Sequence, residues 1–260
     1  MIANRCPHRF VPLSMGKRVG DKVQCRYHGL GFDGQGTCVH SPFPGDPPAH
    51  VSAPAMPIVE KHRGCLRIEG NYELITDNLM DLTHAEFRHI ETFGVNGSIF
   101  HGEQTVRQDE DGAIWNNWDM TAAEPPEWSK SMMKPGQKID QWLHMRWHAP
   151  AAMALTVGIA RAGTRRAALI VPPMVNPHII TPETETSSHY FYDQEDNPEA
   201  AEMARRVFAL EDEPMIEAAQ RALGTQDFWD ARPAILKTDA GAIRARRALM
   251  QLRKAEEAAA

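Results

Sequence analysis

The sequence has few of the features that would place a protein in a membrane, outside the cell or on nucleic acid. It contains no run of about eighteen apolar residues, which a membrane-spanning helix needs. Its first residues, IANRCPHR, are polar, whereas an export signal has an apolar core. A formal net charge of -6 without a long Lys/Arg cluster argues against nucleic acid or anionic lipid as the main partner. We therefore expect a soluble, cytoplasmic enzyme.

Cysteine is scarce, histidine is plentiful, and no internal repeat is present. The chain has 260 residues, enough for one large domain or two of ordinary size. In a reducing compartment, thiols are more often metal ligands or plain side chains than disulfides. Twelve histidines accompany only four cysteines, which are Cys6, Cys25, Cys38 and Cys65.

Residues 1–68 have the pattern of a small, loop-rich β domain. Short β-like runs occur at 22–24, 36–39 and 56–60, and they are separated by turns rich in glycine and proline, such as GFDGQG and SPFPGDPPAH. We predict that this domain ends at residue 68.

Residues 69–260 have a different pattern. Apolar residues at helical spacing predict a helix over 72–89, and alternating apolar and polar residues predict one antiparallel sheet over about 99–192. Stretches rich in Ala, Arg, Glu and Leu predict helices over 197–220 and 239–257. The predicted fold class is α+β, with a small β domain followed by a helix-flanked antiparallel sheet.

Two loops near the start each pair a cysteine with a histidine. Cys6-x-His8 and Cys25-x-x-His28 supply two thiolates and two imidazoles, which can hold either a tetrahedral zinc ion or a [2Fe-2S] cluster. Zinc fingers pair like with like on each knuckle, whereas here each loop carries one ligand of each kind, which suits two metal ions side by side. The spacing therefore favours iron and sulfur. Flanking Pro and Gly residues allow tight turns that direct backbone N–H groups at sulfur.

The motifs CPHR and CRYHG resemble the Rieske cluster motif of the Rieske non-haem iron oxygenases. The resemblance implies that Cys6 and Cys25 ligate one iron of a [2Fe-2S] cluster, and that His8 and His28 ligate the other. Cys38 and Cys65 match no motif position, so we expect ordinary thiols there. A non-catalytic Rieske electron carrier and a zinc-stabilised protein are the alternatives from other classes.

A second group of polar residues lies in NLMDLTHAEFRH. Asp81 and His84 are three apart and share a helix face, so we expect the carboxylate to accept a hydrogen bond from one ring nitrogen and to orient the other for metal. His89 lies about 140° further round an ideal helix, so the helix must bend or end between the two histidines. Two histidines and a carboxylate form the facial triad of Fe(II) oxygenases. The pattern resembles the family's D-x-x-H-x-x-x-x-H motif, and we expect Asn78 beside the ligands.

The third ligand must come from a later carboxylate. The stretch ALEDEPMIEAAQ offers Glu211, Asp212, Glu213 and Glu217, and chemistry alone does not choose among them. The stretch resembles the family's late Glu-Asp helix, which implies Asp212 as the ligand. We expect Glu211 and Glu213 to belong to a solvated acidic first turn.

The resemblance also implies a mechanism and partners. The cluster would receive single electrons from a ferredoxin or flavin reductase, with NAD(P)H acting only through that reductase, and a mononuclear Fe(II) would activate O2. The family forms ring-shaped homotrimers, in which the residue corresponding to Asp81 links a Rieske histidine of one subunit to an iron ligand of the next. Here these would be His28 and His84, so Asp81 is the predicted catalytic residue.

The segment HIITPETETSSHYFY, residues 178–192, resembles the vanillate and dicamba O-demethylases. It implies that His178 contacts the substrate, and that a methoxylated aromatic acid such as vanillate is demethylated to a phenol and formaldehyde. A ring-hydroxylating dioxygenase and an aryl-methyl or sulfonate monooxygenase stay open. Compared with the family, we expect the first strands of the Rieske domain, part of the connection after Gly64 and a few residues of 197–212 to be missing from this sequence.

Overall fold

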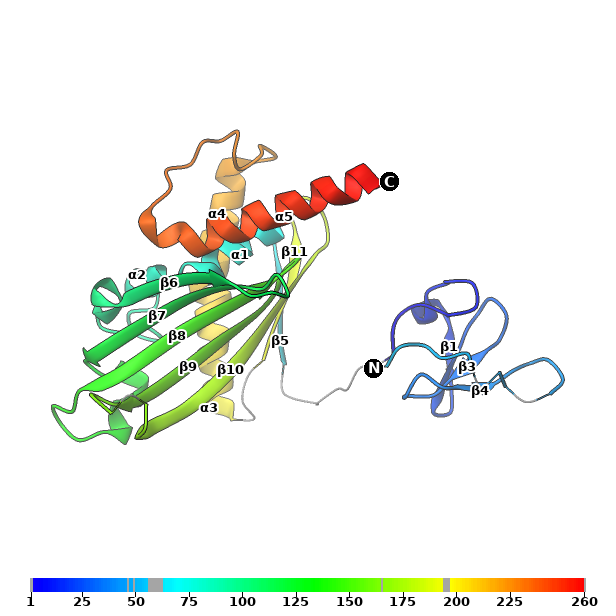
Figure 1. The fold of residues 1–260 in the computed structure, drawn as a ribbon, viewed down its shortest axis with the longest axis horizontal. Helices are drawn as coiled ribbons and strands as arrows, with labels where there is room; N and C mark the ends of the chain where they lie inside the picture. Colours follow the sequence, from blue (N-terminus) through cyan, green and yellow to red (C-terminus); the bar gives the residue numbers. More distant parts are fainter. Residues whose placement is uncertain are drawn as a thin grey trace. The chain divides into compact units, whose positions relative to one another are not determined.

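The computed structural model describes residues 2–45, 47–48, 50–55, 63–164, 166–193 and 197–259. The chain divides into two compact units, Met1–Glu60 and Lys61–Ala260. Each unit has its own group of buried apolar side chains. In Figure 1 the first unit is coloured blue, and the second unit runs from cyan to red.

The first unit contains a small antiparallel sheet with strand order β1-β2-β3-β4. One strand lies where it was predicted, at 22–24, and another, at 38–40, overlaps the predicted run 36–39 and begins two residues later. The predicted run 56–60 lies outside the described residues. A short 3-10 helix, η1 (Leu13–Met15), packs Leu13 into the core beside Cys6 and Cys25. The strands are β1 (Lys17–Val19), β2 (Lys22–Gln24), β3 (Gly31–Phe32) and β4 (Cys38–His40).

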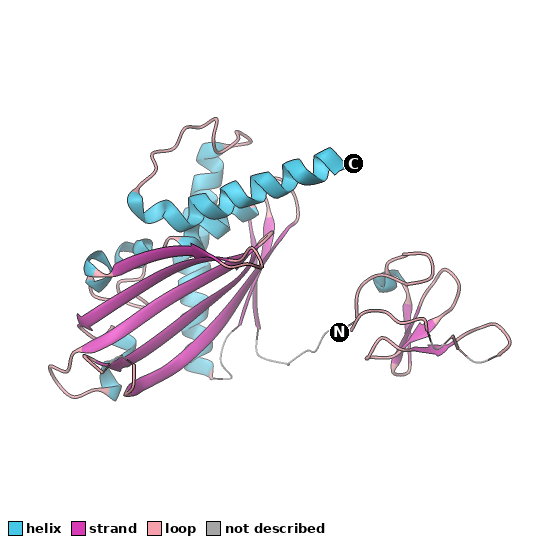
Figure 2. Cartoon of the chain, viewed as in Figure 1, coloured by secondary structure: helices cyan, strands magenta, loops and turns pink. Residues whose placement is uncertain are grey.

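The second unit is built on one seven-stranded sheet (Figure 2). Every neighbouring pair is antiparallel, which confirms the predicted kind of sheet. The spatial order is β5-β11-β10-β9-β8-β7-β6. These strands are β5 (Arg63–Ile68), β6 (Glu103–Gln108), β7 (Ile114–Ala123), β8 (Ile139–His148), β9 (Ala152–Arg161), β10 (Leu169–Pro182) and β11 (Ser188–Asp193).

The strand β5 lies just before the domain boundary predicted at residue 68. It pairs with β11, from Ile68 opposite Ser188 to Arg63 opposite Asp193, so it belongs to the second sheet. The division at Glu60 lies eight residues before the boundary predicted at residue 68. The sequence of a strand shows that its backbone needs a hydrogen-bonding neighbour but does not show which strand that neighbour is. Here the neighbour lies more than a hundred residues away in the sequence.

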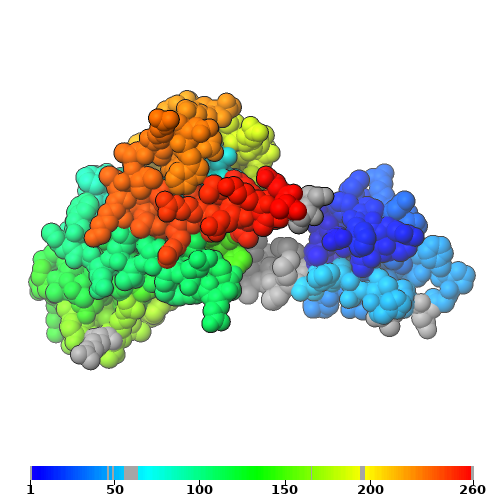
Figure 3. Space-filling view, turned by 45° about the horizontal axis from the view of Figure 1, so that its top comes forward, coloured from blue at the N-terminus to red at the C-terminus, as the bar shows by residue number. Residues whose placement is uncertain are grey.

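The helices of the second unit lie mainly over one face of the sheet (Figures 1 and 2). Contacts join α1 to β8 and β10, and α5 to β7. Figure 3 shows α5 and the segment before it on the surface of this unit. No helix in the described ranges is both long and apolar enough to cross a membrane. The helical elements are α1 (Tyr72–Met80), η2 (Leu82–His84), α2 (Ala85–Arg88), η3 (Ser98–His101), η4 (Glu127–Met132), α3 (Pro198–Arg205), η5 (Arg206–Asp212), α4 (Glu213–Leu223), η6 (Lys237–Asp239) and α5 (Ala240–Ala259).

The core lies between this helical layer and the sheet. On β8 the buried residues Ile139, Leu143, Met145 and Trp147 lie on one face, as expected for a strand with a covered face, and Trp142 on the other face is also buried. Helix α1 buries Ile75, Leu79 and Met80 against them. Its first turn is capped by the Asn71 side chain, which accepts a hydrogen bond from the backbone N–H of Glu73. The sheet thus holds α1, and α1 leads directly into the candidate site.

Candidate functional site

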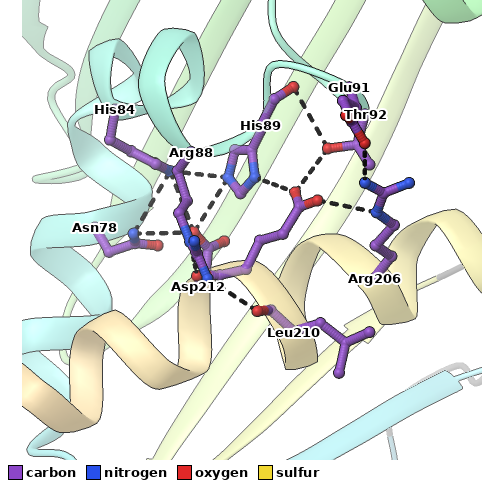
Figure 4. A network of polar contacts seen from close by, with 10 residues as sticks. Asn78, His84, Arg88, His89, Glu91, Thr92, Arg206, Leu210 and Asp212 are labelled. Carbon is purple, nitrogen blue, oxygen red and sulfur yellow. Dashed lines mark hydrogen bonds and ion pairs between the residues drawn. The ribbon is translucent and has the colours of Figure 1, made fainter.

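Three predicted metal ligands meet at one point beside the helical layer (Figure 4). The Nε2 atoms of His84 and His89 are 3.1 Å apart. The Oδ1 atom of Asp212 lies 3.4 Å from the first and 3.1 Å from the second. Three donor atoms about 2.1 Å from one metal, in mutually perpendicular directions, would be about 3.0 Å apart. The two imidazoles and the carboxylate therefore fit a single divalent cation.

The two histidines converge because the chain changes helix type around them. Helix α1 ends at Met80, and His84 closes the 3-10 turn η2. The four residues of α2 follow, and His89 caps them with non-helical φ and ψ of -110° and 30°. The prediction that the helix bends or ends between the histidines is therefore confirmed. The single predicted helix over 72–89 is three short segments.

The third ligand atom comes from a π-helix. Asp212 is the last residue of η5, a seven-residue π-helix that leads into α4. Its carboxylate is buried, and Arg88 donates hydrogen bonds to the backbone carbonyl oxygens of Leu210 (2.9 Å) and Glu211 on the same segment. Of the other carboxylates considered, Glu217 accepts a hydrogen bond from the backbone N–H of Glu69. The resemblance-based choice of Asp212 matches the observed cluster.

The electrostatics of the cluster favour a bound cation. Burial alone would raise the pKa of Asp212, but hydrogen bonds and charge from His84 and His89 lower it to about 2. Burial lowers the pKa of His84, and its contact with Asp212 outweighs this and raises it. Asp212 is therefore an ionised carboxylate next to two imidazoles throughout the neutral range, and a divalent cation satisfies all three groups.

Asp81 holds His84 in a way that differs from the prediction. The Nδ1 atom of His84 contacts the backbone carbonyl oxygen of Asp81, so the carboxylate does not orient the ring. The carboxylate instead accepts hydrogen bonds from the backbone N–H (3.0 Å) and hydroxyl (2.7 Å) of Thr83. The reason is that α1 ends before Asp81, which becomes the N-cap of η2 and not part of a continuous helix. A carbonyl oxygen only accepts, so it still fixes Nδ1 as the protonated nitrogen of His84.

Asn78 lies beside the ligands, where it was expected. Its Nδ2 atom is 3.4 Å from Oδ1 of Asp212 and 3.5 Å from Nε2 of His84. A cleft of about 300 Å³ opens on this side. Its walls include Asp81 and the same two side chains, Asn78 and His84, and the remaining lining comes from Asp77, Phe228, Pro233, Ala234, Ile235, Asp239, Ala242 and Ile243.

Sequence reasoning missed Glu211. We expected a solvated side chain, but it is buried and contacts Nδ1 of His89 at 2.7 Å. Thr92 and Arg206, neither of which the sequence singled out, also contact its carboxylate. The only signal in the sequence was its position next to the expected ligand Asp212.

The first unit places its four predicted ligands on two loops with the same backbone pattern. The N–H of Cys6 donates to the carbonyl oxygen of Val11 (2.9 Å), and the N–H of Phe10 donates to that of Cys6 (2.8 Å). In the second loop, Cys25 donates to Leu30 (2.8 Å) and Gly29 to Cys25 (3.0 Å). The fifth residue of each loop, Phe10 or Gly29, has a positive φ, of 62° and 75°. The two loops therefore form equivalent turns.

These turns bring like ligands together. Both cysteines are buried, and burial raises the pKa of the Cys6 thiol while backbone N–H groups of His8 and Arg9 lower it. The rings of His8 and His28 pack edge to face with centroids 4.6 Å apart. Cys6 and Cys25 also contact each other through their thiols. A cysteine pair and a histidine pair match the ligand division of a Rieske cluster, in which N–H groups directed at sulfur tune the reduction potential.

His178 is buried in the second unit. Its Nδ1 atom lies 2.7 Å from the hydroxyl of Tyr190, and among the described residues Nε2 has no hydrogen-bond partner. Burial lowers the pKa of His178 to about 4, although the charge of Asp212 raises it in part. The ring also packs edge to face on Phe208, a residue of η5. His178 is therefore a neutral imidazole with one nitrogen that has no hydrogen-bond partner among the described residues, and it lies close enough to Asp212 for that charge to affect its pKa.

Comparison with known proteins identifies both units. The family model described as Rieske [2Fe-2S] domain matches residues 1–57, and the model of the vanillate O-demethylase oxygenase C-terminal domain matches residues 68–255. The chain is 34% identical to the oxygenase component of chloroacetanilide N-alkylformylase from Rhizorhabdus wittichii, covering 98% of this chain and 85% of that protein. It is 31% identical to the oxygenase component of dicamba O-demethylase from Stenotrophomonas maltophilia, covering 97% and 86%.

Solved structures agree with the sequence relatives. A crystal structure of dicamba monooxygenase bound to dicamba matches with a TM-score of 0.67 and 30% identity, over 99% of this chain and 87% of that one. The alignment with the N-alkylformylase extends over 299 positions, more than the 260 residues of this chain, so that relative contains internal segments that this chain lacks. The matches confirm the predicted fold class and the predicted [2Fe-2S] and mononuclear iron cofactors. The chain therefore belongs to the Rieske non-haem iron oxygenases, as an oxygenase component of the vanillate O-demethylase group.

Proposed function

We propose that His84, His89 and Asp212 hold the mononuclear Fe(II) of this oxygenase. The convergence of their three donor atoms, all within 4.8 Å of one another, carries this proposal. The [2Fe-2S] cluster is assigned to Cys6 and Cys25 on one iron and to His8 and His28 on the other. When bound, the cluster supplies electrons one at a time and the mononuclear iron supplies the site of O2 activation.

The protein's own groups prepare the iron site. The carbonyl oxygen of Asp81 holds the Nδ1 proton of His84, so that Nε2 presents its lone pair to the metal. Asn78 donates towards Oδ1 of Asp212 and restrains that carboxylate. The Asp81 carboxylate lines the same cleft as His84, and Thr83 donates two hydrogen bonds to one of its oxygens.

The proposed substrate is a methoxylated aromatic acid such as vanillate. Relatives named vanillate O-demethylase and dicamba O-demethylase are 31% identical to this chain. The overall reaction consumes one aryl methyl ether, O2, two electrons and two protons, and it yields a phenol, formaldehyde and water. Hydroxylation of the methyl carbon gives a hemiacetal. The bond between that carbon and the ether oxygen then breaks, which releases formaldehyde and the phenol.

His178 is the proposed contact for the substrate's carboxylate or phenol. When the Tyr190 hydroxyl donates to Nδ1, the proton of the neutral ring lies on Nε2. The free Nε2 is then a donor that suits an anionic oxygen. Because the side chain is buried and uncharged, it selects by a directed hydrogen bond and not by a long-range charge.

A second candidate is oxidation of an aryl methyl group or sulfonate. It is favoured by 30% identity, over 98% of this chain, to the iron-sulfur subunit of the toluene-4-sulfonate monooxygenase system of Comamonas testosteroni. The two candidates differ in their products, because only demethylation releases formaldehyde. A ring-hydroxylating dioxygenase would instead add both oxygen atoms to the substrate.

The protein also needs an external electron donor, which we propose to be a ferredoxin or flavin reductase in the cytoplasm, with NAD(P)H consumed by the reductase. The proposed assembly is a homotrimer in which Asp81 links His84 to His28 of a neighbouring copy. The exposure of His84 and Asp81 to the cleft supports this role for Asp81. Sedimentation analysis of the purified protein tests the assembly.

The metal assignment is tested by iron and acid-labile sulfide analysis of anaerobically purified protein, together with low-temperature EPR after reduction. We expect three irons and two sulfides per chain with a Rieske-type signal. The variant His84→Ala should keep two irons and two sulfides, and Cys25→Ser should lose the sulfide. The exposed His101→Ala serves as the matched control. Three irons in His84→Ala would refute the ligand set, and zinc without sulfide would refute both centres. Formaldehyde release from a panel of methoxylated and sulfonated aromatic acids then tests the substrate class.

A further inference from the structure

Glu211 contacts three side chains directly behind the candidate iron site, and its contacts with His89 and Thr92 are buried. Its Oε2 atom lies 2.7 Å from Nδ1 of His89 and accepts a hydrogen bond of 2.7 Å from the Thr92 hydroxyl. Its Oε1 atom accepts one of 3.1 Å from Nε of Arg206. Arg206 is held in turn by Glu91, whose Oε2 lies 2.6 Å from Nη2 (Figure 4). Both carboxylate oxygens of Glu211 are therefore occupied, and none of these partners is a predicted ligand except His89.

We propose that Glu211 is a positioning residue that fixes the tautomer and orientation of His89 for iron binding. The proposal rests on the ligand set given above, and it adds a carboxylate whose function the ligand motif does not assign. An ionised carboxylate only accepts hydrogen bonds, so Nδ1 of His89 must be the donor. The neutral ring then has its lone pair on Nε2, the atom that lies 3.1 Å from both Asp212 and His84.

The π-helix explains how one segment can do this. An α-helix separates consecutive side chains by about 100°, and a π-helix has more residues per turn and so a smaller angle. Glu211 and Asp212 are consecutive at the end of η5, and they contact opposite nitrogens of the same ring. The shorter Asp212 reaches Nε2, and the longer Glu211 reaches around to Nδ1. The imidazole of His89 is therefore clamped between two neighbouring carboxylates.

The same contacts explain why the two carboxylates do not exchange functions. Glu211 already accepts from an imidazole, a hydroxyl and a guanidinium, and its carboxylate lies on the side of His89 away from Nε2. Arg206 supplies a positive charge that suits an anion in a buried position. Among the residues that the structure describes, Asp212 has the two histidines and Asn78 as partners and no arginine. One carboxylate is thus neutralised by the protein, and the other is left for the metal.

The substitution Glu211→Gln tests the proposal, because it keeps the shape and removes one acceptor. If the oxygen of the new amide faces His89, its NH2 group meets the N–H of Arg206, and two donors oppose each other. If the amide turns round, its NH2 donates to Nδ1 and places the ring proton on Nε2, where the metal should bind. Either arrangement should weaken Fe(II) binding by about 10–100-fold, the usual cost of losing an outer hydrogen-bond partner of a ligand.

The measurement is anaerobic titration of metal-depleted catalytic iron sites with Fe(II) against a chelator of known affinity, with the Rieske EPR signal recorded on each sample. The control Glu213→Gln changes a glutamate two positions along the chain, and this variant should bind Fe(II) as the wild type does. The double variant Glu211→Gln/Arg206→Met removes the opposing donor, so the amide oxygen can face His89 again. If Glu211→Gln lowers the Fe(II) affinity a hundredfold, we expect the double variant to bind Fe(II) at least tenfold more tightly than Glu211→Gln. This rescue distinguishes positioning from general damage to the fold.

The outcomes separate this proposal from the ligand assignment. If the wild type binds no Fe(II) at His84, His89 and Asp212, the ligand set fails. If the wild type binds Fe(II) and Glu211→Gln binds it equally tightly, the positioning function of Glu211 is refuted. If Glu211→Gln binds weakly and Arg206→Met restores nothing, Glu211 acts by its charge and the tautomer mechanism is refuted.

Discussion

A buried arginine fastens the C-terminal helix to the helix that carries the candidate site. Arg246 of α5 contacts both carboxylate oxygens of Asp77 on α1, with Nε 2.9 Å from each and Nη2 2.7 Å from Oδ2. Its Nη1 donates to Glu73 at 2.8 Å, and its guanidinium carbon lies 3.9 Å from the centre of the Phe228 ring. Because Asp77 directly precedes Asn78 on α1, this ion pair helps to hold the part of α1 that lies next to the proposed iron ligands.

The variant Arg246→Met should destabilise the second unit by about 3–5 kcal/mol, the usual cost of leaving one charge of a buried pair without its partner. Asp77 is the residue left unpaired, since Glu73 keeps its 2.7 Å contact with Arg253. For a unit of this size the loss corresponds to a melting midpoint about 6–20 °C lower.

The loss should also depend on pH. Burial raises the pKa of Asp77 to about 6 even while Arg246 lowers it, and the variant removes the lowering contribution. The unfolded value is about 3.9, so the folded pKa lies above the unfolded one. The folded state is then penalised progressively as pH rises from about 4 through the folded pKa. Arg246→Met should therefore lose more stability at pH 8 than at pH 5.

Tryptophan fluorescence can follow this unit alone, because all six tryptophans lie between residues 115 and 229. Thermal melts of the wild type, Arg246→Met and Arg246→Met/Asp77→Asn at pH 5 and pH 8 give the required comparison. The double variant should recover part of the loss at pH 8, since it no longer buries an unpaired charge. A loss below about 1 kcal/mol, or one that is equal at the two pH values, would refute this reasoning.

Three further predictions concern the two metal sites and His178. Asp81→Asn should keep both metal centres and lose most turnover, because an amide oxygen still caps Thr83 while the negative charge is gone; wild-type turnover with full metal content would contradict its proposed role. Gly29→Val should lower cluster content, measured by visible absorption, because φ is +75° and a Cβ atom would lie 3.0 Å from a proline ring, whereas Gly34→Val, with open space around it, should not. His178 should show a constant ring Cε1 chemical shift from about pH 5.5 to 8.5, because burial lowers its pKa to about 4 and the ring is neutral throughout; a titration near the ordinary value of about 6.5 would contradict this.

Some of the site could be predicted because its signals are local. The spacing within Cys6-x-His8 and Cys25-x-x-His28 is set by single turns, and the structure shows each as a short loop closed by two backbone hydrogen bonds. The requirement for a break between His84 and His89 also follows from the helical angle alone. The sequence did not show where the break falls, so the orienting group of His84 was assigned to the wrong oxygen of Asp81.

Other features depend on distant parts of the chain and left no local signal. The segment 63–68 is recognisable as a strand, but its partner β11 follows more than a hundred residues later, after the other strands of the sheet. The acidic run around Glu211 has the composition of an exposed first turn. Glu211 is buried because η5 is a π-helix and because Arg206, Thr92 and His89 surround its carboxylate. A change in hydrogen-bond register from i→i+4 to i→i+5 is decided by these tertiary contacts.

The irregular backbone of the site creates unpaired groups, and residues next to the ligands satisfy them. The Asp81 carboxylate accepts from the backbone N–H of Thr83 in η2, and Arg88 donates to two carbonyl oxygens of η5. Glu86 accepts from the backbone N–H groups of Val95 and Gly97 in the turn after His89. Such buried backbone groups need partners whether or not metal is bound. Substitutions here therefore act on the backbone and on the metal together, and a fall in turnover alone does not distinguish the two effects. Metal affinity, cluster content and unfolding must be measured separately on each variant before a residue is assigned to the chemistry.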